Sequence, residues 1–169
     1  MYAGFWKRLQ AFLWDYVLIG AYLLIITALF WLLPFSERLF ANRIQAQGSA
    51  FFILTLPIIL YFTIFESSAK QGTWGKQKTA LIVTGSNGER ISFPRSFART
   101  LLKFIPWELS HTLIWEINLH PQTEPTWINI GFGVVYLLVG LNLASLLMTK
   151  KRQTLYDLAK KTCVIHKHQ

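Results

Sequence analysis

The chain has 169 residues, of which 53% are hydrophobic and 15% are aromatic, yet it carries a formal net charge of +9. This apolar fraction beside so much charge excludes an ordinary soluble domain, and the length suits a single domain of a few helices. Because the basic residues adjoin long apolar runs, their charge indicates anionic lipid headgroups as the partner, and not nucleic acid.

The first two membrane spans are predicted by uncharged runs. Residues 16–34 form 19 uncharged residues, which as a helix cover about 28 Å, the thickness of a hydrocarbon core. Asp15 lies at the start of this run, so the segment is too long and too polar for a cleaved signal and predicts a retained span over 9–34. A second span is predicted over 49–66, where a neighbouring helix must cover the carbonyl that Pro57 frees.

Residues 67–103 predict a module outside the bilayer. Apolar residues alternate with polar ones on both sides of Asn87-Gly88, a pattern typical of a β-hairpin. Pro94 then opens a helix in which Arg95, Arg99 and Lys103 recur every four residues and share one face. We expect this helix to lie on the membrane surface, with its opposite, apolar face towards the lipid.

The distribution of Lys and Arg predicts a fourth crossing. Residues 126–149 form 24 uncharged residues and a third strong span, followed by a tail over 150–169. Fifteen of the 17 basic residues precede the first span or lie in 70–103 and in the tail, so these regions face the cytoplasm. Both termini can face the cytoplasm only if the weaker stretch 104–119 also crosses; a re-entrant segment there is the alternative. Gly140 and Ala144 are spaced for close helix packing, either inside the bundle or in a dimer.

Two acidic residues near the predicted cytoplasmic boundary are candidates for function. Asp15 lies about 10 Å from Arg8 along one helix, too far for an ion pair, and therefore needs another partner, such as Arg99, a proton or a bound cation. A purely structural pairing is the alternative. Glu66 ends the second span and is expected to pair with Lys70 or Lys76. The Gly72–Lys76 segment departs from a phosphate-binding loop and is interpreted as a tight turn.

Several motifs in one order make the chain resemble the RDD family of bacterial membrane proteins, named for an arginine and two aspartates. Residues 6–15 (WKRLQAFLWD) carry Arg8 and Asp15, and residues 152–158 (RQTLYDL) carry Asp157. The segment GTWGK at 72–76, Gly88 and Arg99 fit in between, whereas Lys160 and Lys161 depart from the small residues usual in the family. The resemblance covers residues 4 to about 165. It implies a membrane domain with a loosely transport-associated role, for which sodium/proton exchange has been proposed in some members.

These observations predict one all-α membrane domain over 1–169, a bundle of about four transmembrane helices in the cell membrane, with a cytoplasmic β-hairpin and an interfacial amphipathic helix. The leading hypothesis is cation or proton handling by Asp15. The alternative is a regulatory or scaffolding protein that binds anionic lipid, a membrane-protein partner or a second copy of itself. No catalytic or metal-ligand motif occurs, so we expect no enzyme activity, cofactor or metal. The candidate residues of the charge network are Arg8, Asp15, Glu66, Arg99 and Asp157.

Overall fold

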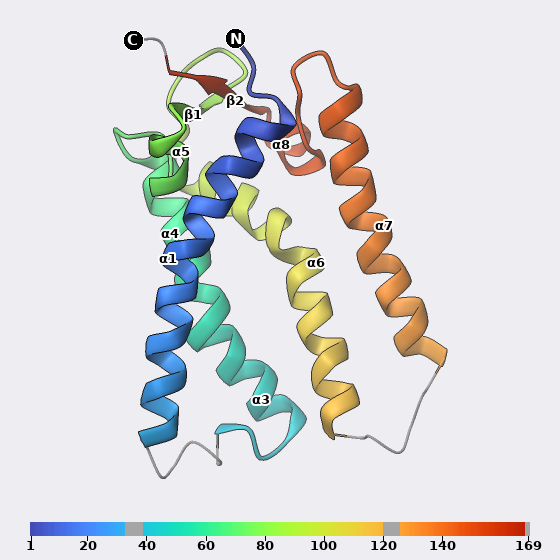
Figure 1. Ribbon diagram of the computed structural model, residues 1–169. Coiled ribbons are helices and arrows are strands. Elements are labelled where there is room, and N and C mark those ends of the chain that lie inside the picture. Colours follow the sequence, from blue (N-terminus) through green and yellow to red (C-terminus); the bar gives the residue numbers. More distant parts are fainter. Residues whose placement is uncertain (33–38, 120–125, 168–169) are drawn as a thin grey trace.

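The computed structural model describes residues 1–32, 39–119 and 126–167, which are mostly helical (Figure 1). The end of the predicted 9–34 span, the connection at 120–125 and the last two residues of the tail lie outside the described residues. Within these described ranges, three helices are long and apolar enough to cross a membrane. They are α1 (Phe5–Leu32), the helix over Arg43–Ser67, and α7 (Thr126–Met148).

The Arg43–Ser67 helix contains a π-helical turn directly before its proline-containing segment. It consists of α3 (Arg43–Ala50), the π-helical turn η1 (Phe51–Thr55) and α4 (Leu56–Ser67). Pro57 has no N–H to donate to the carbonyl of Ile53, four residues earlier. That carbonyl accepts a hydrogen bond from the Tyr22 hydroxyl of α1 instead. The expectation that a neighbouring helix covers the freed carbonyl is confirmed.

The fourth long helix, α6 (Phe93–Leu119), differs from the prediction in two ways. One continuous helix replaces the separate surface helix and crossing, with Pro106 inside it. Its basic stripe also points inward: Arg99 is buried, whereas Leu101 and Ile105 on the apolar face are exposed. The physical reason is that buried carboxylates on neighbouring elements compensate Arg99. At 27 residues α6 is about as long as α1, but it is not among the three candidate spans, so four crossings are not confirmed.

The two chain ends lie together at one end of the helices (Figure 1). A polar layer covers this end and comprises residues 1–4, 68–92 and 149–167. It contains α5 (Trp74–Lys78), β1 (Leu81–Gly85), α8 (Leu155–Ala159) and β2 (Thr162–His166). Its buried apolar side chains come from the N-terminus, α1, β1, the segment before α6, and β2; they are Ala3, Ala11, Leu81, Val83, Ile91 and Val164.

The predicted β-hairpin is wrong in its strand pairing. The turn itself forms: Gly88 has a φ of +85°, and the Gly85 N–H donates to the Glu89 carbonyl at 2.8 Å. Beyond it, only one isolated bridge joins Thr84 to Arg90, because α6 begins at Phe93. β1 pairs instead with β2, antiparallel, from Leu81↔His166 to Gly85↔Thr162. The C-terminal strand therefore closes the sheet.

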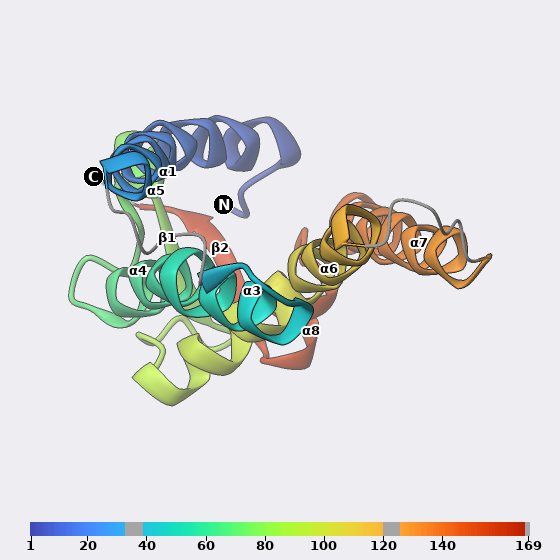
Figure 2. The ribbon, with the colours of Figure 1, turned by 90° about the horizontal axis from the view of Figure 1, so that it is seen from below.

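The helices do not form a closed bundle. Seen from below, α6 lies between α4 and α7, and α7 lies apart from α1 (Figure 2). A Cβ atom added at Gly140 would meet nothing within 4 Å, so this glycine does not serve packing inside the chain. Of the two roles predicted for the spacing of Gly140 and Ala144, close helix packing inside the bundle is therefore not seen at Gly140 among the described residues.

Candidate functional site

Asp15 lies fully buried where α1 meets the polar layer, and three neutral groups bind its carboxylate. The Tyr61 hydroxyl of α4 donates to Oδ1 at 2.8 Å, and the Thr73 hydroxyl donates to Oδ2 at 2.6 Å. The backbone N–H of Gly75, in the first turn of α5, donates to Oδ1 at 2.8 Å. No lysine, arginine or histidine of the described chain lies within ion-pair distance of Asp15. The Asp15 charge is therefore stabilised by dipoles and not by an ion pair.

The short helix α5 brings two of these donors to Asp15. Thr73 is its N-cap residue, with an extended backbone, and its side chain accepts from the Lys76 N–H. Capping fixes the first turn, so that the free N–H of Gly75 points at α1. Gly75 packs directly against the Ala11 carbonyl of α1. The segment that the sequence indicates as a tight turn is thus a capped helical turn docked on α1.

A second centre is an ion-pair network around Arg99. Its guanidinium donates to Glu66 at 2.6 Å from Nη1, and to Asp157 at 2.7 Å from Nη2 and 2.8 Å from Nε. Lys76 reaches the other oxygen of Glu66 at 2.8 Å. Glu66 and Asp157 are fully buried, and Arg99 is 2% exposed. Arg99 therefore joins α4 to α8 through two carboxylates that are removed from solvent.

Arg8 completes the network from α1. Its Nη1 donates to Asp157 Oδ2 at 2.8 Å, and its other guanidinium nitrogens donate to the backbone carbonyls of Ala3 and Arg152. Asp157 also accepts from the Thr154 N–H at 3.3 Å and the Thr162 hydroxyl at 3.0 Å. Two of the candidate residues of the predicted charge network, Arg8 and Asp157, therefore form a direct ion pair.

The surroundings of Asp157 set its acidity. Complete burial opposes ionisation, but the guanidiniums of Arg99 and then Arg8 outweigh burial and hold the pKa of this carboxyl well below its usual range. A carboxyl whose pKa is lower in the folded than in the unfolded state stabilises the fold above its unfolded value, which is about 3.9. This contribution to stability is lost as pH falls below that value.

We therefore expect a pH-dependent effect of Asp157→Asn in detergent-solubilised protein. At pH 7 the variant should have a clearly lower free energy of unfolding than the native chain, because Arg8 and Arg99 lose a charged partner. As pH falls below about 4 the difference should shrink, because Asp157 binds a proton in the unfolded chain while the folded carboxyl still resists protonation. Thermal unfolding of both proteins across this range measures the difference. A gap that stays constant with pH would contradict the assignment.

Lys103, one turn after Arg99 on α6, is the basic residue without a carboxylate partner in this region. Its ammonium lies 3.4 Å from the centroid of the Phe62 ring. No acidic group of the described residues lies within 4.0 Å of it. Burial and then the neighbouring Lys76 charge lower the pKa of Lys103 to about 7. An anion at this position would restore its full charge.

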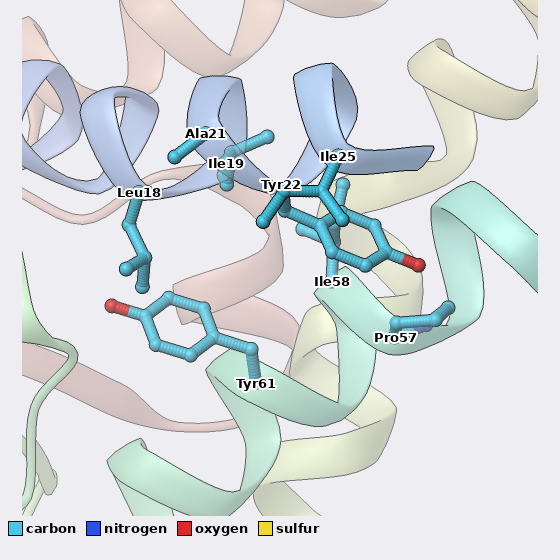
Figure 3. A pocket seen from close by; sticks show the side chains of 8 residues that line it. All are labelled: Leu18, Ile19, Ala21, Tyr22, Ile25, Pro57, Ile58 and Tyr61. Carbon is cyan, nitrogen blue, oxygen red and sulfur yellow. The ribbon is translucent and has the colours of Figure 1, made fainter. Parts of the chain in front are cut away.

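An apolar groove runs beside Asp15 between α1 and α4. It encloses about 360 Å³, and the hydroxyls of Tyr22 and Tyr61 point towards its opposite ends (Figure 3). The Tyr61 hydroxyl contacts Asp15, and the Tyr22 hydroxyl binds the Ile53 carbonyl. The other lining side chains are aliphatic, apart from Pro57. The groove therefore offers few oxygen ligands for a cation.

The polar residues of the predicted weak crossing face the α3–η1 helix. Glu108 accepts from Gln47 at 3.2 Å and from the Thr55 hydroxyl, and lies 3.7 Å from His111. Glu116 pairs with Arg43 at 3.0 Å. Polar groups within a membrane are expected on the protein-facing side of a helix, and this arrangement has that form.

The structure sorts the five candidate residues into two groups. Arg8, Glu66, Arg99 and Asp157 belong to one ion-pair network; of the two expected partners of Glu66, Lys70 and Lys76, the structure shows Lys76. Asp15 does not contact Arg99, which is occupied by the other two carboxylates.

The sequence reasoning missed Tyr61 and Lys103, and it did not assign Thr73 to Asp15. Thr73 could have been recognised as an N-cap residue before a short helix. Tyr61 carried no signal, because an aromatic residue inside an apolar span is most often a packing residue.

One of the three comparisons with known proteins finds a match. A model of the RDD family matches residues 2–161, nearly the whole chain, including Arg8, Asp15 and Asp157. Neither the curated proteins nor the solved structures contain a significant match. The family match covers both charge centres and the apolar helices that carry them. This chain belongs to the RDD family.

Proposed function

We propose that the protein handles a proton or a monovalent cation at Asp15, at the cytoplasmic end of the bundle in the cell membrane. One observation carries the proposal. Of the fully buried carboxylates Asp15, Glu66 and Asp157, only Asp15 lacks a basic partner among the described residues. A buried carboxylate that pairs with no fixed cation is the group that can exchange a mobile one.

The neighbours of Asp15 suit reversible loading. Tyr61 and Thr73 donate hydroxyl hydrogens, which can rotate away from the carboxylate when a proton or cation arrives. The Gly75 N–H comes from the backbone of α5 and cannot rotate. Loading Asp15 would therefore weaken its hydrogen bonds to Tyr61 and Thr73. The loaded or unloaded state of Asp15 would thus change how firmly α1 is held to α4 and α5.

The test is ion flux in proteoliposomes. Protein reconstituted with a pH-sensitive dye should move protons in response to a sodium, potassium or proton gradient, and Asp15→Asn should abolish this flux. An asparagine can keep an oxygen towards Tyr61 and Gly75, so the variant should remain folded, as thermal unfolding would show. Glu89→Gln, at an exposed turn, is the matched control and should leave flux unchanged. Absence of flux in the native protein under every gradient would end the proposal.

The hydrogen bonds that Asp15 already accepts favour a second function, a regulatory or scaffolding role. Its three donors already occupy the carboxylate, and an ionised group so bound can serve structure alone. The protein would then be a regulatory or scaffolding component that uses its polar layer to bind a membrane protein. Co-purification of one defined membrane partner, together with absent flux, would support this function over cation handling.

A further inference from the structure

A small cavity in the middle of the ion-pair network has more positive than negative charge around it. It encloses about 90 Å³ beneath the polar layer. Its basic lining residues are Arg8, Lys76, Arg99 and Lys103. The carboxylates near these groups are Glu66, Asp157 and, through space from Lys103, Asp15. When Lys103 is protonated, one positive charge therefore lacks a counter-charge, and Lys103 is the lining residue that forms no ion pair within the described part of the chain.

At Lys103 the cavity continues into an apolar groove that is different from the one beside Asp15. A second hollow of about 140 Å³ shares Phe12 and Lys103 with the first. Its remaining lining is apolar or aromatic and comes from α1, α4 and α6: Tyr16, Ile19, Ile58, Phe62, Phe104 and Trp107. The side chains of Phe12, Tyr16 and Trp107 are each at least 40% exposed at its edge. Lys103 thus stands between a basic chamber and an apolar groove.

We propose that this double cavity binds one membrane lipid with an anionic phosphate headgroup, the phosphate beside Lys103 and an acyl chain along the α1–α4–α6 groove. The occupant follows from complementarity: an anion matches the unbalanced charge, and a hydrocarbon chain matches the groove. At about 30 Å³ per water molecule, the chamber holds the volume of about three waters, enough for the charged part of a phosphate group. Asp15 does not line either hollow, so lipid binding does not depend on cation handling.

The experiment is equilibrium lipid binding to full-length, delipidated protein in a neutral detergent, followed by native mass spectrometry. Dioleoyl phosphatidylglycerol should bind about five- to tenfold more tightly than phosphatidylcholine with the same chains, as expected for one added charge contact in a partly buried site. Lys103→Met should remove this preference. Lys150→Met removes the same charge from an exposed position at the same end of the molecule, and should retain the preference.

Further arms identify the source of the phosphate. Glycerol phosphate and inorganic phosphate, which lack acyl chains, should fail to displace the bound lipid at millimolar concentration. Displacement by either would show that the site takes a free anion and would overturn the lipid assignment, as would equal binding of phosphatidylcholine. These arms use the native protein and decide the question even if Lys103→Met does not fold. Asp15→Asn should keep the lipid preference, so failure of cation handling and failure of lipid binding are distinguishable.

Discussion

Replacing Arg99 by methionine should destabilise the protein more than any other single substitution in the buried ion-pair network. Methionine fills similar space but leaves Glu66 without one of its two cations and Asp157 without the guanidinium that donates twice to its Oδ1, while both carboxylates remain buried. Breaking a buried ion pair from one side costs about 3–5 kcal/mol, because the remaining charge stays desolvated. The expected result is a large fall in the thermal unfolding temperature and loss of the folded polar layer.

Two further variants identify the origin of this effect. Arg90→Met removes a guanidinium from an exposed position just after the Asn87-Gly88 turn, and should change stability little. Arg99→Lys should recover part of the stability, because one ammonium can reach one carboxylate but cannot bind both in the forked geometry of arginine. If Arg90→Met and Arg99→Met were equally unstable, the effect would come from net charge and not from the buried network.

Replacing Gly75 by alanine should separate α5 from α1. The added Cβ would overlap the Ala11 carbonyl and lie 2.9 Å from Cγ of Asp15. The obstructing atoms belong to a helix backbone and to a carboxylate held by three hydrogen bonds, so they cannot move aside cheaply. Overpacking of this kind costs about 1–3 kcal/mol, and the displaced α5 would also lose the bond from its Gly75 N–H to Asp15. Lower thermal stability and faster proteolysis within 68–80 should follow.

Gly20→Ala is the matched control on α1. A Cβ at Gly20 meets nothing within 4 Å, and alanine is the better helix former by about 1 kcal/mol. This variant should be as stable as the native chain or slightly more stable. Equal damage from both substitutions would mean that the contact between Gly75 and Ala11 is not the cause.

The sequence alone determined the features that depend on local composition. Long uncharged runs identified three apolar helices, because a span requires about twenty consecutive apolar residues whatever surrounds it. The motifs around Arg8, Asp15 and Asp157 identified the family, since they are short and contiguous. Charge spacing along α1 also excluded a pair between Arg8 and Asp15, because helix geometry fixes that distance.

Tertiary structure decided which partner each polar group takes. The alternation around Asn87-Gly88 favoured a local hairpin, but β1 found a better partner in β2, some 80 positions later in the chain; no local pattern records such a distant pairing. Likewise, Arg95, Arg99 and Lys103 form the basic face of a helix in any environment, and local patterning places such a face towards water. This basic face points into the protein because Glu66 of α4 and Asp157 of α8 pair with Arg99 there.

The partners of Asp15 were likewise decided by segments that are distant in the sequence. The sequence marked it as a carboxylate in need of a partner, with Arg99 among the options. Arg99 is taken by carboxylates from two other elements, and the donors to Asp15 come from α4 and from the segment that includes α5. The sequence shows that a charged group at a membrane boundary needs a hydrogen-bond or ion-pair partner. Which neighbour becomes that partner depends on how the whole chain packs.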